Sequence, residues 1–231
     1  MLKKSSGLKF KSIIIGATGA TGQKVLNQLI KNDNCSSITY VGRNKLKDFQ
    51  IHNKINQIII KSLLNLSSTK NLWKGHDVFF NCIGTTKKKA GSADKFYEIE
   101  YGISNEAARF ASEGNIPHAC LVSASGADHD RLAIKWIHPL FYSKTMGDKE
   151  QTILSNFQFK QTSIFKPGML IRRMKVNDTL DKILQFTGLG LDVNDLAKAM
   201  VNNAEKVYYK KTSVQNLTVH GNNDIRLLLK T

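Results

Sequence analysis

The chain has 231 residues and a formal net charge of +16, with 41% hydrophobic and 23% charged residues. These values are typical of a globular protein, and they exclude a disordered or fibrous chain. No run approaches the roughly 18 apolar residues that cross a bilayer. The three cysteines lie far apart and outside any C-x-x-C pair, so neither a disulfide framework nor a thiolate zinc site is indicated. We therefore expect a soluble, cytoplasmic protein.

The positive charge suits an anionic partner such as dinucleotide phosphates, nucleic acid, a membrane surface or an acidic protein. The basic residues are spread along the chain, with small clusters at residues 87–89, 172–173 and 210–211. No basic helix interleaved with stacking aromatic residues is evident. This distribution favours a general solubilising charge over a nucleic-acid-binding face.

Short β-branched runs alternate with longer segments of helical spacing, which is typical of the strands and crossover helices of a parallel sheet. Six apolar strands are predicted: Ser12–Ile15, Ile38–Val41, Gln57–Ile60, Val78–Cys82, His118–Val122 and Thr162–Phe165. The predicted helices are Gly22–Lys31, Phe96–Glu113, Tyr142–Ser155, Asn177–Phe186, Asp192–Ala204, with Asp192 as N-cap, and a short one after Asn223. The pattern predicts an α/β Rossmann fold with a doubly wound, mostly parallel sheet.

We expect residues 1–231 to form a single NAD(P)-binding domain. Residues 11–168 are predicted to be its nucleotide-binding core, because all six predicted strands lie there. Glycines and a Pro-Gly pair divide residues 169–231 into small pieces. This last part is predicted to form C-terminal helices and a small cap on the substrate side.

A G-x-x-G-x-x-G run joins the first predicted strand to the first predicted helix, with glycines at Gly16, Gly19 and Gly22. Gly16 permits a tight exit from the strand, Gly19 lets the backbone approach a pyrophosphate, and Gly22 lets the helix pack closely on the sheet. The helix N-terminus adds free N–H groups and a partial positive charge. A turn that is merely rich in small residues is the alternative. The isoleucine strand before the run and the amphipathic helix after it favour a dinucleotide site.

The ends of two later strands carry further candidate contacts with the nucleotide. An NAD-binding domain places Asp or Glu at the end of the second strand, whereas this chain has Gly42-Arg43-Asn44. The Arg43 guanidinium suits a 2′-phosphate, which favours NADP(H); an ordinary solvated arginine is the alternative. After the fourth strand, Gly84 would let the backbone pass close to adenine and ribose, or it simply ends the strand.

Three residues are candidates for chemistry at the nicotinamide end. Carbonyl reduction needs a tyrosine that exchanges a proton with the reacting oxygen and a serine that donates a hydrogen bond to it. Ser123 and Ser125 follow the fifth strand, and Tyr142 stands near the start of the next helix. The alternatives are that the serines are turn residues and that Tyr142 is a half-buried packing aromatic.

The helix of Tyr142 lacks a lysine four residues on, where it would face the cofactor and favour tyrosinate, because Met146 stands there. Lys144 lies about 200° round the helix and points elsewhere. Lys149 shares the face of Tyr142 but lies about 10 Å further along the axis. Neither lysine is therefore well placed to replace the lysine expected four residues after Tyr142. The six histidines show no metal-ligand spacing, so neither a metal site nor a hydrolase is expected.

Five segments together resemble the Tat-interacting protein 2 family of atypical short-chain dehydrogenases/reductases. They are residues 16–22, 41–44, 82–91, 123–128 and 165–168. The resemblance implies phosphate contacts from Thr18, Gly19, Ala20 and Thr21, a 2′-phosphate contact from Arg43, and a catalytic role for Tyr142. The complete set of expected cofactor contacts is Gly16, Thr18, Gly19, Ala20, Thr21, Gly22, Arg43, Asn44, Ile83, Gly84, Met146, Pro167 and Leu170.

Two hypotheses follow for the function. The first is an NADPH-dependent oxidoreductase that acts on an unidentified carbonyl substrate, with Tyr142 as acid/base and Ser123 or Ser125 polarising the carbonyl. The second is a non-catalytic NADP(H)-binding regulator that acts through protein contacts. The resemblance implies nuclear-import receptors as such partners and a nuclear fraction of the protein. Nucleic-acid binding is a third and weaker reading.

Overall fold

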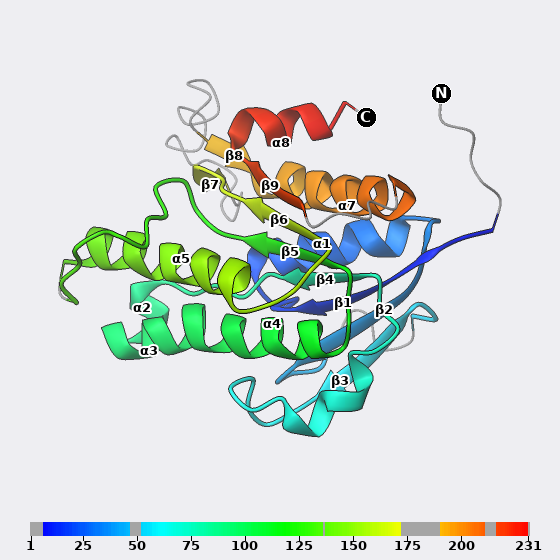
Figure 1. Cartoon of the computed structure of the whole chain (residues 1–231), viewed down its shortest axis with the longest axis horizontal. Coiled ribbons are helices and arrows are strands. Elements are labelled where there is room, and N and C mark those ends of the chain that lie inside the picture. The colour runs from blue at the N-terminus through cyan, green and yellow to red at the C-terminus, as the bar shows by residue number, and fades with distance from the viewer. Residues whose placement is uncertain (1–6, 47–51, 136, 172–189, 211–215, 231) are drawn as a thin grey trace.

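The computed structural model describes residues 7–46, 52–135, 137–171, 190–210 and 216–230. Seven described strands form one sheet in the order β3-β2-β1-β4-β5-β6-β9, and each neighbouring pair is parallel (Figure 1). The order reverses between β1 and β4, which makes the carboxyl ends of these two strands the switch point where Rossmann folds bind ligands. The predicted doubly wound parallel sheet is confirmed.

The strands agree with the predicted ones to within a few residues, with one addition. Their bounds are Phe10–Ile15 (β1), Cys35–Gly42 (β2), Ile55–Ile59 (β3), Val78–Asn81 (β4), His118–Val122 (β5), Gln161–Phe165 (β6) and Asn216–His220 (β9). The sequence analysis missed β9, because this edge strand is exposed or half-buried throughout and mixes polar with apolar residues. A separate parallel pair, β7 (Met169–Ile171) with β8 (Gly190–Asp192), was also not predicted.

The helices are α1 (Ala20–Lys31), α2 (Lys87–Ala90), α3 (Ala93–Tyr97), α4 (Ile103–Glu113), α5 (His138–Ser155), α7 (Val193–Lys210) and α8 (Asn222–Leu228). A 3₁₀ turn, η2, spans Ser67–Leu72. The Asp192 carboxylate accepts a hydrogen bond from the Asn194 amide at 2.8 Å, as expected of the predicted N-cap of α7. The predicted helix Asn177–Phe186 lies outside the described residues.

The predicted helix Phe96–Glu113 is divided in the structure. A π turn, η3 (Glu98–Gly102), separates α3 from α4. Glu100 lies within this turn and is buried. Single π turns often occur at functional sites, and hydrophobic periodicity does not reveal them.

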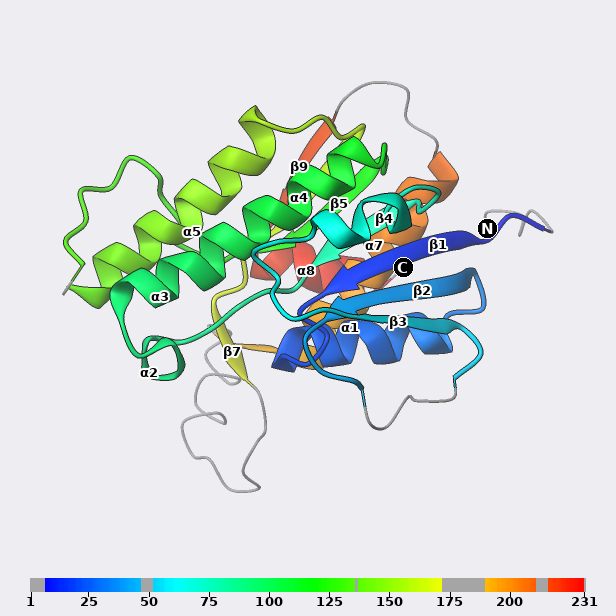
Figure 2. The same ribbon diagram turned by 90° about the horizontal axis from the view of Figure 1, so that it is seen from below.

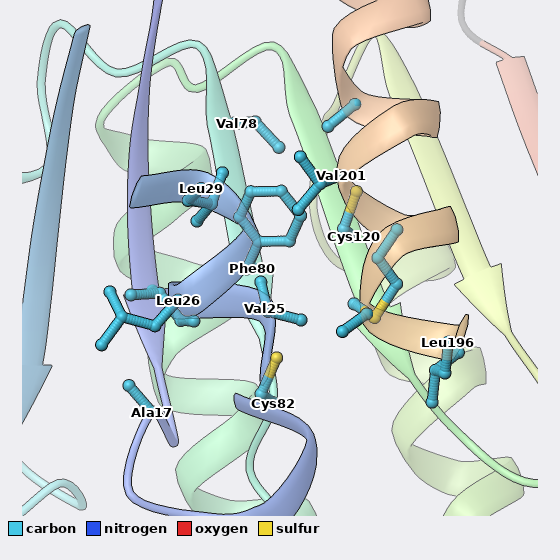
Figure 3. Close-up of a cluster of buried hydrophobic side chains, with 14 of the residues drawn as sticks. Ala17, Val25, Leu26, Leu29, Val78, Phe80, Cys82, Cys120, Leu196 and Val201 are labelled. Carbon is cyan, nitrogen blue, oxygen red and sulfur yellow. The ribbon is translucent and has the colours of Figure 1, made fainter. Parts of the chain in front are cut away.

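The sheet separates two apolar layers because successive strand residues face opposite sides. On β1, Ile14 packs with the side chains of α1 and α7, whereas Ile13 and Ile15 pack with those of α4. Figure 2 shows these helices on either side of the sheet. Figure 3 shows part of the first layer, in which Leu29 of α1 and Val201 of α7 lie beside Phe80 of β4.

Candidate functional site

The turn between β1 and α1 leaves no room for side chains at two of its glycines. Gly16 has a φ of +76°, and a Cβ there would lie 2.4 Å from the Cys82 carbonyl oxygen. A Cβ on Gly22 would lie 2.2 Å from the Gly16 oxygen. Both positions therefore require glycine, and the turn is seated against the loop that follows β4.

The same turn carries exposed residues at the start of α1, and its Gly19 amide donates to the Gly16 carbonyl oxygen at 2.9 Å. Thr18, Gly19 and Ala20 are exposed. Gly19 caps α1 without a side-chain hydrogen bond, and the first turn of the helix contains no acidic residue. The first N–H groups of a helix have no acceptor within it, so this end is electropositive. A turn with no room for a Cβ at two of its glycines, beside an electropositive helix end, fits the diphosphate of a dinucleotide.

At the end of β2, Arg43 and Asn44 are exposed. The Tyr40 hydroxyl donates to the Asn44 carbonyl oxygen at 3.0 Å. Burial raises the pKa of Tyr40, while the charge of Arg43 and a hydrogen bond with Thr18 act in the opposite direction. Tyr40 thus connects the phosphate turn with the Arg43 segment.

The sequence analysis missed the role of Tyr40. The one feature of the sequence that points to this role is the glycine two residues later, because a Cβ on Gly42 would lie 1.8 Å from the Tyr40 hydroxyl oxygen. Glycine at this position is needed for the ring of Tyr40 to fold back over the strand end.

The loop after β4 is supported from beneath by a buried ion pair. The Lys149 ammonium lies 3.4 Å from Glu100 Oε2 and donates to the Ile83 carbonyl oxygen at 3.1 Å. Glu100 Oε1 accepts from the Thr85 amide at 2.6 Å. The side chains of Lys149 and Glu100 are 1% and 4% exposed. The pair fixes the backbone on both sides of Gly84, which is itself exposed.

The structure shows where Met146, which replaces the expected lysine of α5, and the two nearby lysines lie. Met146 is buried. The Lys144 ammonium donates to the His129 carbonyl oxygen and pairs with Asp148 at 2.8 Å, so it points away, as predicted. Lys149 extends beneath the β4 loop.

The two candidate serines have different surroundings. Ser123 is buried, and its hydroxyl donates to Glu150, whose second oxygen lies 2.9 Å from the Lys166 ammonium. Ser125 is exposed, and its amide donates to the Pro167 carbonyl oxygen at 2.8 Å. The hydroxyl hydrogen of Ser123 is therefore already used, whereas Ser125 lies at the surface of the strand end.

Tyr142 is half-buried in the first turns of α5. Its ring centroid lies 5.9 Å from that of Phe96 and 6.0 Å from that of His138. Packing on one side of the ring is compatible with both the packing and the catalytic role of this tyrosine.

The segment after β6 lies against the end of β5. The Gly168 amide donates to the Asn222 side chain at 3.0 Å, which ties the segment to α8. Leu170 is half-buried and packs against the layer that contains α1 and α7. Pro167 thus contacts the end of β5, and Leu170 lies on the α1 and α7 side of the sheet; their contacts with a cofactor stay a prediction.

Within the described ranges, no group of three or more His, Cys, Asp or Glu side chains has a geometry that could hold a metal ion. No described helix is both long and apolar enough to cross a membrane.

Residues 16–207 match the protein family described as NAD(P)H-binding. Protein HTATIP2 of Rattus norvegicus is 31% identical over 172 residues, which cover 74% of this chain and 67% of that protein. Protein FMP52, mitochondrial, of Meyerozyma guilliermondii is 33% identical over 161 residues, which cover 70% and 65%. These alignments span about two thirds of each relative. The FMP52 protein of Candida albicans is 28% identical, with 94% of this chain and 97% of that protein covered.

Solved structures of low sequence identity share the fold. The oxidoreductase ylbE of Lactococcus lactis has a TM-score of 0.65 at 14% identity, with 96% of this chain and 97% of that one covered. Gre2 of Candida albicans, solved with NADPH, has a TM-score of 0.65 at 16% identity, with 91% and 77% covered.

The expectation of a cytoplasmic location with a nuclear fraction is wrong. Relatives from three yeasts carry the name Protein FMP52, mitochondrial. The cysteine pattern shows only a reducing environment, which does not distinguish the cytosol from other reducing compartments.

Proposed function

Because the chain belongs to the NAD(P)H-binding family, and within it to the atypical short-chain dehydrogenases/reductases related to HTATIP2 and FMP52, we propose that it binds NADP(H) and reduces a carbonyl substrate. The family is NAD(P)-binding and oxidoreductase-like. The preference for NADP(H), the substrate class and the residue roles are our proposals.

The observation that carries the proposal is the exposed guanidinium-bearing segment beside the phosphate turn. Arg43 follows β2 directly, and Tyr40 links this strand end to Thr18 in the turn. A 2′-phosphate on the adenosine ribose would meet Arg43 while the diphosphate meets the amides at the start of α1. No carboxylate stands in the Gly42-Arg43-Asn44 segment to bind an unmodified ribose.

NADPH supplies a hydride to the carbonyl carbon when it is bound. Tyr142 would donate its hydroxyl proton to the carbonyl oxygen: the carbonyl π bond and the Tyr142 O–H bond break, the product O–H bond forms, and the tyrosinate left behind takes a proton from water. Ser125 donates a hydrogen bond to the same oxygen. We choose Ser125 over Ser123 because the only hydroxyl hydrogen of Ser123 is donated to Glu150.

A second candidate function, a non-catalytic NADP(H)-binding regulator, is favoured by one observation. The buried Met146 stands where a lysine would hold the ribose, and neither Lys144 nor Lys149 places its ammonium there. Such a protein would bind NADPH and show no turnover.

Fluorescence titration with NADPH and NADH tests the cofactor preference. We expect Arg43→Ala to weaken NADPH binding about 10- to 100-fold, as loss of a charged hydrogen bond implies, and to leave NADH binding unchanged. Lys45→Ala, at an exposed cation two residues away, is the matched control. Equal affinity of the native protein for both dinucleotides would overturn the NADP(H) preference.

NADPH oxidation over a panel of aldehydes and quinones separates the enzyme from the regulator. We expect Tyr142→Phe to abolish turnover and Met146→Lys to raise it. Tight NADPH binding without turnover in the native protein and in Met146→Lys would establish the regulator instead.

A further inference from the structure

Three large apolar side chains are exposed in the loop that joins β5 to α5. Leu132 is 92% exposed, Ile134 48% and Ile137 43%. Single exposed apolar residues are common on protein surfaces, but a cluster within six residues marks an interaction site. We call Leu132, Ile134 and Ile137 the apolar tip.

A cluster of cations lies next to the apolar tip. Lys87, Lys88 and Lys89 of α2 are all exposed. In both views of the ribbon, α2 and the loop before α5 lie at the same end of the molecule (Figures 1 and 2). Lys135 of the loop pairs with Asp94 of the adjacent α3 at 2.5 Å, and the charge of Lys87 acts on His138, the residue after the tip.

The other charges of this region largely cancel. Arg131 lies 3.4 Å from Asp128, and Lys135 is paired with Asp94. His129 faces Asp130 at 2.9 Å. In contrast, none of the three α2 lysines has a described carboxylate within ion-pair distance. The positive surplus of this surface therefore comes from α2.

Apolar side chains that project beside a set of lysines are typical of a surface that binds anionic lipid, since the chains enter the headgroup region while the ammonium groups contact lipid phosphates and carboxylates. We infer that the apolar tip and α2 dock this protein on an anionic lipid bilayer. This inference does not depend on cofactor binding. A twofold contact with a second copy through the same surface would bring two lysine clusters together, where like charges repel.

Docking in this orientation turns the substrate side of the sheet toward the bilayer. The tip lies in the segment between Ser125 and Tyr142, and α5 begins at the next residue after Ile137. A substrate dissolved in the membrane would then reach the strand ends without crossing water.

Co-sedimentation of the full chain with vesicles tests the inference. We expect binding to phosphatidylcholine vesicles that contain phosphatidylserine, little binding to phosphatidylcholine alone, and weaker binding at high salt. The Lys87→Gln/Lys88→Gln/Lys89→Gln variant should bind about 100-fold more weakly, from the loss of three cations near an anionic surface. Leu132→Asp/Ile134→Asp should lose at least about 10-fold.

A second region, in which the leucines are much less exposed than Leu132, provides control positions. Leu64 and Leu72 are 40% and 39% exposed, near the exposed Lys61, Lys70 and Lys74. The corresponding Asp and Gln variants of these residues should keep vesicle binding. Far-ultraviolet circular dichroism of every variant checks that the fold is intact, which keeps this test separate from that of the proposed function.

Three results would overturn the docking proposal. The first is a native protein that does not sediment with the anionic vesicles. The second is a set of control variants that lose as much binding as the tip variants. The third is a native dimer in gel filtration that Leu132→Asp/Ile134→Asp converts to a monomer, since the tip would then bind a second copy.

Discussion

The β1–α1 turn and helix α5 hold their parts of the site in different ways. In the turn, backbone atoms lie so close to Gly16 and Gly22 that no other residue fits, and the residues Thr18 to Ala20 between them are exposed. Along α5, charged side chains hold the site together. Lys149 pairs with Glu100, and Glu150 joins Ser123 to Lys166. The β1–α1 turn thus depends on shape, whereas the parts of the site that α5 supports depend on which charged residues are present. Substitutions in the turn and along α5 should therefore affect the site in different ways.

The largest effect on nucleotide binding is expected at Gly16. Gly16→Ala combines a positive φ with a clash against the Cys82 carbonyl, so NADPH affinity should fall by about 100-fold or more as the turn moves. Gly75→Ala is the matched control, because Gly75 has a φ of +79° but no atom near its Cβ position. That variant should lose only about 1 kcal/mol of stability and keep NADPH affinity. Equal behaviour of the two variants would contradict the shape argument.

The second prediction concerns the buried pair on the other side. Lys149→Met leaves the Glu100 carboxylate buried without a cation and should lower the free energy of unfolding by about 3–5 kcal/mol. Adding Glu100→Gln should recover part of this loss, because a neutral amide oxygen still accepts from the Thr85 amide. Urea unfolding of the three proteins measures both effects. A double variant no more stable than Lys149→Met would show that the charge is not the cause.

A third prediction uses His118, a buried residue with no opposing charge. Burial, together with His220, lowers the pKa of His118 to about 3. Because this pKa is below its unfolded value of 6.5, the contribution of His118 to stability is fully present above pH 6.5 and is lost as pH falls toward 3. Stability should fall by about 1 kcal/mol from pH 6.5 to 5.5 through this group. His118→Gln, which does not titrate, should lack that part of the slope in urea unfolding at each pH.

The smallest effect is expected at Cys82, whose carbonyl lies against Gly16. Burial raises the pKa of this thiol to about 12, although Lys149 acts in the opposite direction. We expect no alkylation by iodoacetamide at neutral pH in the folded protein. Lys149→Met should raise the alkylation rate by loosening the β4 loop, whereas Gly75→Ala should not. Rapid labelling of Cys82 in the native protein would show that the two sides of the site are not packed together.

The sequence predicted the fold well, because the fold follows from local patterns. Six strands and the phosphate turn are visible as apolar runs and spaced glycines, and the Arg43 segment as the residues that end a strand. The seventh strand, β9, was missed because an edge strand has little apolar signal.

The side-chain supports along α5 could not be predicted from one sequence. Glu100 reaches Lys149 across 49 residues, through a π turn that interrupts an otherwise regular helical pattern. Lys149 was noted on the face of Tyr142, but its direction beneath the β4 loop depends on a carboxylate that spacing along α5 does not show. Contacts of this kind depend on the tertiary arrangement.

Amide NMR of the isotopically labelled chain during titration with NADPH tests the central claim most directly. The account predicts that the largest shifts fall on the amides of Thr18, Gly19, Ala20 and Thr21, with further shifts at Arg43 and Gly84. Saturable NADPH binding that leaves the amides of residues 16–22 unmoved would contradict it.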